Sequence, residues 1–159
     1  MKNQYLLISL LFIFIFTSDV RSQDVIRQVG CSDNAILLKA DSVKQDLIKQ
    51  GFIIVKEASM TMESEYEMPV IVPLTQGSWY QFVFIGDVSS KLYEVRMFDW
   101  NEKQVVYEKH ISGDPDANVI SYSYIPQFSE YHMIKPLQVN KKKKKELCGY
   151  VMLLKKVKQ

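Results

Sequence analysis

The stretch GSWYQFVFIGD, residues 77 to 87, decides the fold class of this chain. Within it Tyr80, Phe82 and Phe84 recur at every second position, and the polar Gln81 lies between the first two. Such alternation is typical of a strand in an antiparallel sheet that has one face toward water. Turn residues bound the stretch on both sides. We therefore expect a strand over 79–85, with Trp79 and the three other aromatic side chains in the core.

Seven further segments carry the same signature. They are rich in β-branched and aromatic residues, turn signals separate them, and they cover 52–62, 70–74, 92–98, 105–110, 119–125, 131–137 and 147–154. Short strands at near-regular spacing are typical of sandwiches. The sequence therefore predicts a mainly β protein, an antiparallel β-sandwich of about eight strands with a jelly-roll-like arrangement.

One amphipathic helix is expected in front of the strands, over about 33–50. Its apolar positions recur at helical spacing, at Ile36, Ala40, Val43 and Leu47. Ser32 is the expected N-cap and Gly51 the residue that ends the helix. The apolar stripe is of the kind that packs on a core.

Residues 1–22 are expected to form a secretory signal peptide, followed by a single domain over 23–159. Lys2 gives a positive start, residues 5–16 are apolar except for Ser9, and residues 17–22 are polar with small side chains. Cleavage before Gln23 would leave 159 − 22 = 137 residues. The apolar stretch is shorter than the ~20 residues of a spanning helix. We expect a secreted protein, periplasmic or extracellular, with no transmembrane segment in the mature chain.

Cys31 and Cys148 are the two cysteines, near the two ends of the mature chain. In an oxidising compartment a disulfide between them is the obvious hypothesis. Two buried thiols are the alternative, because a free cysteine packs like a small apolar residue.

The succession GSWYQFVF (77–84), VRMFDWNEKQVV (95–106) and ISYSYIPQFSEYHM (120–133) resembles the bacterial pre-peptidase C-terminal domain over roughly 70–139. In that family a strand with an aromatic pair is followed by a strand that ends in Asp and a tight turn, and a later strand ends at Pro. The chain departs from the pattern in its helix and in Glu130, where a turn glycine is usual. The resemblance implies a secreted, non-catalytic accessory domain.

No sequence motif for catalysis is present: there is no nucleophile-elbow serine, HExxH, glycine-rich phosphate loop or paired CxxC. We expect His110 and His132 to be surface or half-buried strand residues. The acidic series Glu63, Glu65 and Glu67 is expected to form a solvated loop, because like charges two apart repel each other. These features favour a protein that is not an enzyme.

The segment DPDAN, residues 114–118, spaces oxygen ligands two apart, as many calcium loops do. The segment does not match an EF-hand, because the positions that require glycine and glutamate are occupied by Val119 and Ile125. A looser calcium site at Asp114, Asp116 and Asn118 is one hypothesis, and an ordinary turn is the other. No further cofactor is expected.

Trp100 lies in the turn FDWNEKQ between two expected strands, where a ring can stack on a sugar. A ring that folds back over the end of the sandwich is the alternative. The two interpretations predict an exposed and a buried indole, respectively.

Charge is divided unevenly along the chain. Residues 23–140 hold 10 basic and 16 acidic side chains, a balance of −6, whereas 141–159 hold eight lysines and one glutamate, a balance of +7. Five lysines cannot enter a core unpaired, so Lys141 to Lys145 are expected in an exposed loop that repulsion keeps extended. Such a loop is either a solvated turn or a patch for anionic polymers, with Lys141, Lys143 and Lys145 as candidate ligand residues and Lys155, Lys156 and Lys158 beside it.

Three functions remain open from the sequence. The first is a binding or adhesion module for a polysaccharide or an envelope protein, without nucleic acid as a partner. The second is a structural or accessory subunit that pairs through a strand edge. The third, with the least support, is a hydrolase with dispersed carboxylates.

Overall fold

The structure is a computed structural model that describes residues 29–157. The expected signal peptide, residues 1–22, lies outside the described residues. One helix and eight strands follow one another along the chain: α2 (Asn34–Lys49), β1 (Phe52–Met62), β2 (Val70–Leu74), β3 (Tyr80–Gly86), β4 (Leu92–Phe98), β5 (Gln104–Ile111), β6 (Val119–Tyr124), β7 (Glu130–Val139) and β8 (Leu147–Lys156). The prediction of eight strands behind one helix is confirmed.

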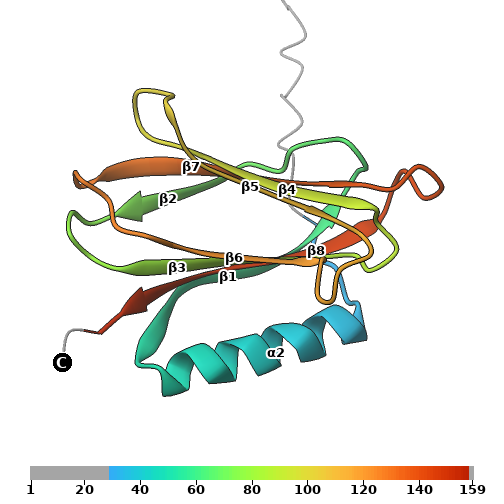
Figure 1. Cartoon of the computed structure of the whole chain (residues 1–159), viewed down its shortest axis with the longest axis horizontal. Coiled ribbons are helices and arrows are strands. Elements are labelled where there is room, and N and C mark those ends of the chain that lie inside the picture. Colours follow the sequence, from blue (N-terminus) through green and yellow to red (C-terminus); the bar gives the residue numbers. More distant parts are fainter. Residues whose placement is uncertain (1–28, 158–159) are drawn as a thin grey trace, which may run out of the picture.

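Two four-stranded antiparallel sheets pack face to face (Figure 1). Sheet A has the order β1-β8-β3-β6 and sheet B the order β2-β7-β4-β5. The first strand therefore lies beside the last, the second beside the seventh, the third beside the sixth and the fourth beside the fifth. This nesting is the jelly-roll arrangement, and it confirms the predicted fold class.

The alternation in residues 80–84 works as expected. Tyr80, Phe82 and Phe84 point between the sheets and are buried, together with Met60 and Ile134 from other strands. Val83 and Ile85 point to the other face of sheet A, where they belong to a second buried cluster. Gln81 is half-buried and donates to Ser121 Oγ at 2.8 Å. The strand is therefore apolar on both sides, because both faces of sheet A are covered.

Helix α2 supplies that cover. Ile36 and Ala40 are buried against Tyr150, Met152 and Leu154 of sheet A. The helix lies below this sheet in Figure 1, on the side away from sheet B. Its N-cap is Asp33, whose Oδ1 accepts the Ile36 N–H at 3.0 Å, so the prediction of Ser32 was wrong by one residue. An Asp at this position satisfies the same orphan donor as a Ser.

Two burial predictions were wrong. Trp79 precedes β3 and is 45% exposed, with its ring edge-on to Phe52 at 5.7 Å, because it lies where the sandwich ends. His132 is 1% exposed, since alternation along β7 turns it inward between the sheets. His110, in contrast, is half-buried as expected.

The outer face of sheet B has no covering helix among the described residues. An ionic cluster occupies it: Glu94 is 7% exposed and accepts from Arg96 at 3.0 Å and from Tyr107 at 3.3 Å, and Lys109 lies at 3.4 Å. Burial alone would raise the pKa of Glu94, but these partners outweigh it and lower the pKa. The cluster keeps this face polar around its middle.

Candidate functional site

Loops gather at the two ends of the sandwich, and the candidate residues divide between them. The aromatic end consists of residues 99–103 between β4 and β5 and residues 125–129 between β6 and β7. The lysine end consists of residues 140–146 between β7 and β8, with residues 63–67 and 87–91 beside them. Strands β4 and β7 run from one end to the other, so the two loop groups lie on opposite sides of the molecule (Figure 1).

Trp100 is 69% exposed, so the ring does not fold back into the core. Tyr131, which is 54% exposed, lies beside it, with the ring centroids 6.3 Å apart and the ring planes inclined by 47°. Two exposed aromatic rings, one from the 99–103 loop and one from the start of β7, thus form one surface. Sequence reasoning missed Tyr131, whose only signal was its outward position next to the inward His132.

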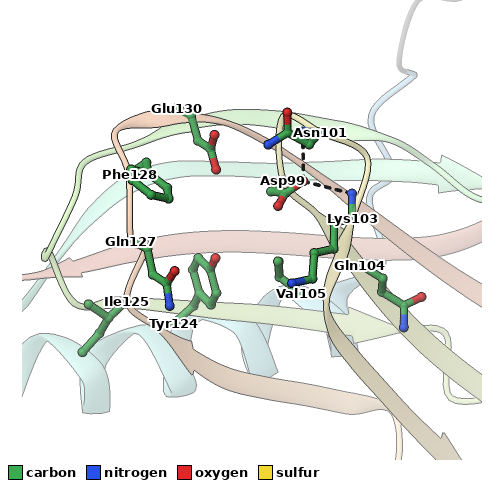
Figure 2. A pocket seen from close by; sticks show the side chains of 10 residues that line it. All are labelled: Asp99, Asn101, Lys103, Gln104, Val105, Tyr124, Ile125, Gln127, Phe128 and Glu130. Carbon is green, nitrogen blue, oxygen red and sulfur yellow. Dashed lines mark hydrogen bonds between the residues drawn. The ribbon is translucent and has the colours of Figure 1, made fainter.

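A cavity of about 370 Å³ opens at the same end of the sandwich, between the 99–103 and 125–129 loops (Figure 2), and neither the Trp100 ring nor the Tyr131 ring lines it. Its lining mixes carboxylates, amides, a lysine and apolar side chains, namely Asp99, Asn101, Lys103, Gln104, Val105, Tyr124, Ile125, Gln127, Phe128 and Glu130. Phe128 is 65% exposed and Ile125 56%. A concave site with a few polar groups among apolar ones is the usual form of a small-ligand site.

Asp99 shapes one wall of the cavity. Its Oδ1 accepts the backbone N–H groups of Asn101 and Lys103, both at 2.9 Å, which closes the turn that carries Trp100 (Figure 2). Glu102 adopts φ 60° in this turn. The turn is therefore fixed by its own backbone, and the exposed indole needs no packing to hold its position.

Tyr124 and Glu130 form the polar floor of the cavity, and the buried His132 lies behind them, outside the lining. The Nε2 atom of His132 lies 3.2 Å from Tyr124 Oη and 3.7 Å from Glu130 Oε1. Burial, together with the charges of Glu130 and Asp99, raises the pKa of Tyr124, so the hydroxyl stays protonated and can donate a hydrogen bond. His132 Nδ1 is a buried polar atom without a hydrogen-bond partner among residues 29–157. The floor is thus backed by one buried imidazole.

At the lysine end, the loop is ordered rather than extended. Asn140 is 4% exposed, and its Oδ1 accepts the N–H groups of Lys142 and Lys143, both at 3.0 Å. Its Nδ2 donates to Ser89 Oγ at 2.8 Å. Residues 141–146 are nevertheless all exposed, as predicted. The expected repulsion is overcome because a buried amide holds the base of the loop.

Two of the three candidate lysines have carboxylate partners. Lys143 Nζ lies 3.4 Å from Asp87 Oδ2, and Lys145 Nζ lies 3.9 Å from Glu63 Oε1. Lys141, Lys142 and Lys144 take part in no ion pair within the described part of the chain. Nothing in the sequence indicated a contact between the acidic 63–67 loop and the lysine loop. In the structure Ser64 N donates to Lys144 O at 2.7 Å and joins them.

The expected single basic patch is wrong. Lys155 and Lys156 end β8, whereas the lysine loop precedes it, and a strand at about 3.3 Å per residue separates them by roughly 25 Å. Lys156 Nζ lies 4.9 Å from the Phe52 ring centroid, at the other end of the sandwich. Lys158 lies outside the described residues. The cations at the end of β8 therefore do not add to the lysine loop.

Residues 114–118 form the bend between β5 and β6. Asp116 is paired with Lys39 of α2 at 2.7 Å and has φ 57°. Within residues 29–157 no group of three or more His, Cys, Asp or Glu is close enough to hold a metal. The candidate calcium residues Asp114, Asp116 and Asn118 are thus not joined by further acidic ligands.

Cys31 and Cys148 form a disulfide, with their Cα atoms 5.7 Å apart. The bond ties the residues before α2 to the start of β8, at the lysine end. It confirms the bridge and excludes the alternative of two thiols. A disulfide is typical of proteins that fold in oxidising compartments. None of the described helices has the length and apolarity to cross a bilayer.

No protein-family model matches the sequence, and no curated protein matches it. The structure shows the β-sandwich, and the resemblance to the pre-peptidase C-terminal domain stays a prediction.

Solved structures with a similar arrangement include adhesin and carbohydrate-binding domains. The K1 cleaved adhesin domain of Lys-gingipain from Porphyromonas gingivalis W83 is 11% identical, with 65% of this chain and 75% of that chain covered and a TM-score of 0.40. TmCBM61 in complex with beta-1,4-galactotriose is 10% identical, with 68% and 84% covered and a TM-score of 0.37. The CBM22-1–GH10 modules of a Clostridium thermocellum xylanase, complexed with xylohexaose, are 11% identical, with 69% and 26% covered and a TM-score of 0.35. At these values the likeness is one of general architecture.

Proposed function

We propose that the protein is a secreted, non-catalytic binding module that binds polysaccharide at the aromatic end. The observation that carries the proposal is the pair of exposed rings, Trp100 and Tyr131, at the end of the sandwich that also holds the 370 Å³ cavity. Exposed aromatic rings can stack on the apolar face of a sugar, and the carboxylates and amides of the cavity can bond its hydroxyls.

The polar groups of the cavity suit hydroxyl recognition. Glu130 and Asp99 supply acceptors, and the amides of Asn101, Gln104 and Gln127 supply N–H donors. A ligand that offers many hydroxyls can pair with both kinds of group. A site that satisfies buried polar groups in this way discriminates against ligands that lack the hydroxyls.

The test is a Trp100→Ala variant on a glycan array, followed by affinity electrophoresis in gels that contain the soluble polysaccharide selected on the array. Loss of one stacked ring should weaken retention about tenfold, or about 1.4 kcal/mol. The melting temperature should stay within a degree or two, because the ring is 69% exposed.

A matched control is available at the other end. Tyr66 is also 69% exposed, and it lies in the loop beside the lysines. Tyr66→Ala should therefore retain the wild-type mobility. If the wild-type protein binds no glycan on the array, or if both variants lose retention equally, the proposal is wrong.

A second candidate function is an accessory subunit that pairs through the edge of β1. Ile53, Ile54 and Val55 are three consecutive exposed aliphatic residues on this edge strand, with exposed fractions of 53%, 37% and 46%. The N-terminal segment covers only the far part of the edge, where Thr61 N donates to Val29 O at 2.8 Å. If this edge self-associates, light scattering will show a mass that rises with concentration, and Ile53→Lys will abolish the rise. A monomer at all concentrations would exclude self-pairing.

A further inference from the structure

The lysine loop is the longest exposed segment that the structure describes. Residues 141–146 form six consecutive exposed positions, the longest such run within residues 29–157. Five of the six are lysines. A peptidase must bind several residues of backbone in an open form, and exposed loop tips with polar side chains are the preferred places for such cleavage.

Opening this loop breaks polar contacts only, those of Asn140 among them. The N–H groups of Lys142 and Lys143 donate to Asn140 Oδ1, and the Lys144 carbonyl oxygen accepts the Ser64 N–H. Residues 141–146 contain no apolar side chain, so local opening exposes no apolar surface. Segments with few buried apolar contacts lie at the low end of local stability.

The disulfide lies directly beyond the loop. Cys148 follows Lys145 by three residues and is bonded to Cys31, on the other side of the loop in the sequence. The segment that follows the loop is β8, which pairs with β1 on one side and with β3 on the other. A cut within the loop would therefore leave its C-terminal piece held by one covalent bond and by two ladders of hydrogen bonds.

We propose that the lysine loop is a site of proteolytic processing by lysine-directed peptidases, and that the cut protein remains one folded, disulfide-linked unit. The step is a hydrolysis: one water molecule is added across the peptide bond after a lysine, which leaves a carboxylate on that lysine and an α-amine on the next residue. The proposal is independent of the ligand at the aromatic end.

Limited digestion of the folded protein with a lysine-specific endopeptidase tests it. The first cut should fall within residues 141–145, and the intact mass should rise by one water. A denaturing gel without reductant should show one species, and with reductant two chains. The nicked protein should still unfold in one cooperative transition.

The matched control replaces Lys141 to Lys145 with arginine, which keeps the charge but removes the cleavage signal. This variant should lose the early cut and be digested at least tenfold more slowly. Lys103 serves as an internal comparison, because it is exposed in the turn that Asp99 closes at the aromatic end. A first cut after Lys103, or a C-terminal piece that separates without reductant, would overturn the proposal.

Discussion

The two ends of the sandwich use polar side chains in opposite ways. At the lysine end, the side chains of the buried Asn140 and Asp87 accept backbone N–H groups of their own loops. Each side chain also contacts a residue of the other's loop, and for Asp87 this residue is Lys143. At the aromatic end, Asp99 closes one turn, Trp100 and Tyr131 remain exposed, and the exposed Phe128 lines a cavity. The polar groups of the lysine end therefore stabilise its own loops, whereas those of the aromatic end remain accessible to a ligand.

This difference teaches that a conspicuous sequence feature need not be the functional one. The run of lysines is the most unusual segment of the chain in composition, yet its loop is fixed by the Asn140 amide, which no sequence pattern indicated. The aromatic end has ordinary turn composition, and only the fold brings Trp100 next to Tyr131. The comparison predicts that changes to the buried Asn140 and Asp87 at the lysine end alter stability, whereas changes at the aromatic end alter binding.

The largest effect is expected from the disulfide. Replacing Cys31 and Cys148 together with serine removes the constraint on a loop with a sequence separation of 117 residues. The free energy of unfolding should fall by about 4 to 5 kcal/mol, from the entropy of loop closure. Urea unfolding at pH 7 measures it. At urea concentrations below its unfolding transition, the variant should still bind glycan as the wild type does. A loss of glycan retention in the folded variant would contradict the contrast between the two ends.

Asp87 should give an effect of intermediate size that depends on pH. Burial alone would raise its pKa, but hydrogen bonds from Ser89 and Cys148 and the charge of Lys143 outweigh it, and the pKa is lowered. A carboxyl whose folded pKa is lowered stabilises the fold above its unfolded pKa, about 3.9, and this stabilisation is lost as pH falls toward the folded value. Asp87→Asn should cost about 1 to 3 kcal/mol at pH 7.

The difference between wild type and Asp87→Asn should therefore shrink between pH 5 and pH 3, as measured by chemical unfolding at each pH. A constant difference across this range would show that the carboxylate charge of Asp87 does not stabilise the lysine end.

The smallest effect is expected from the unpaired lysines. Changing Lys141, Lys142 and Lys144 to glutamine removes three exposed charges that have no ion pair within residues 29–157, so the free energy of unfolding should change by less than about 0.5 kcal/mol. On an anionic polysaccharide column this triple variant should elute at lower salt if the loop also binds polyanions. Unchanged elution would leave the loop with a structural role and with the proposed cleavage.

The sequence predicted the strands well because period-two alternation and turn residues are local signals. The apolar residues of 80–84 and those of the helix at Ile36 and Ala40 are buried, as their spacing predicted. It could not place Trp79 and Trp100 correctly relative to the core, because both stand just outside a strand. The burial of such a residue depends on the end of the sandwich at which it lies and on the side chains of the neighbouring loop.

The site was less predictable for the same physical reason. The contact between His132 and Tyr124 joins the inner faces of β7 and β6, which lie in different sheets. Likewise Asp87 meets Lys143 across 56 positions of sequence. Such pairs follow from the nesting of the strands, and no spacing along one segment encodes them.

The position of β8 also determines when the protein can fold. Because β8 lies between β1 and β3, the last strand of the chain is an inner strand of sheet A. Strands β1 and β3 share no ladder with each other, so sheet A cannot assemble until residues 147–156 have been synthesised. Pairings of this sequence separation make folding slow, in the range of milliseconds to seconds for such topologies. Strand β8 is therefore the element that completes sheet A by joining β1 to the β3–β6 pair.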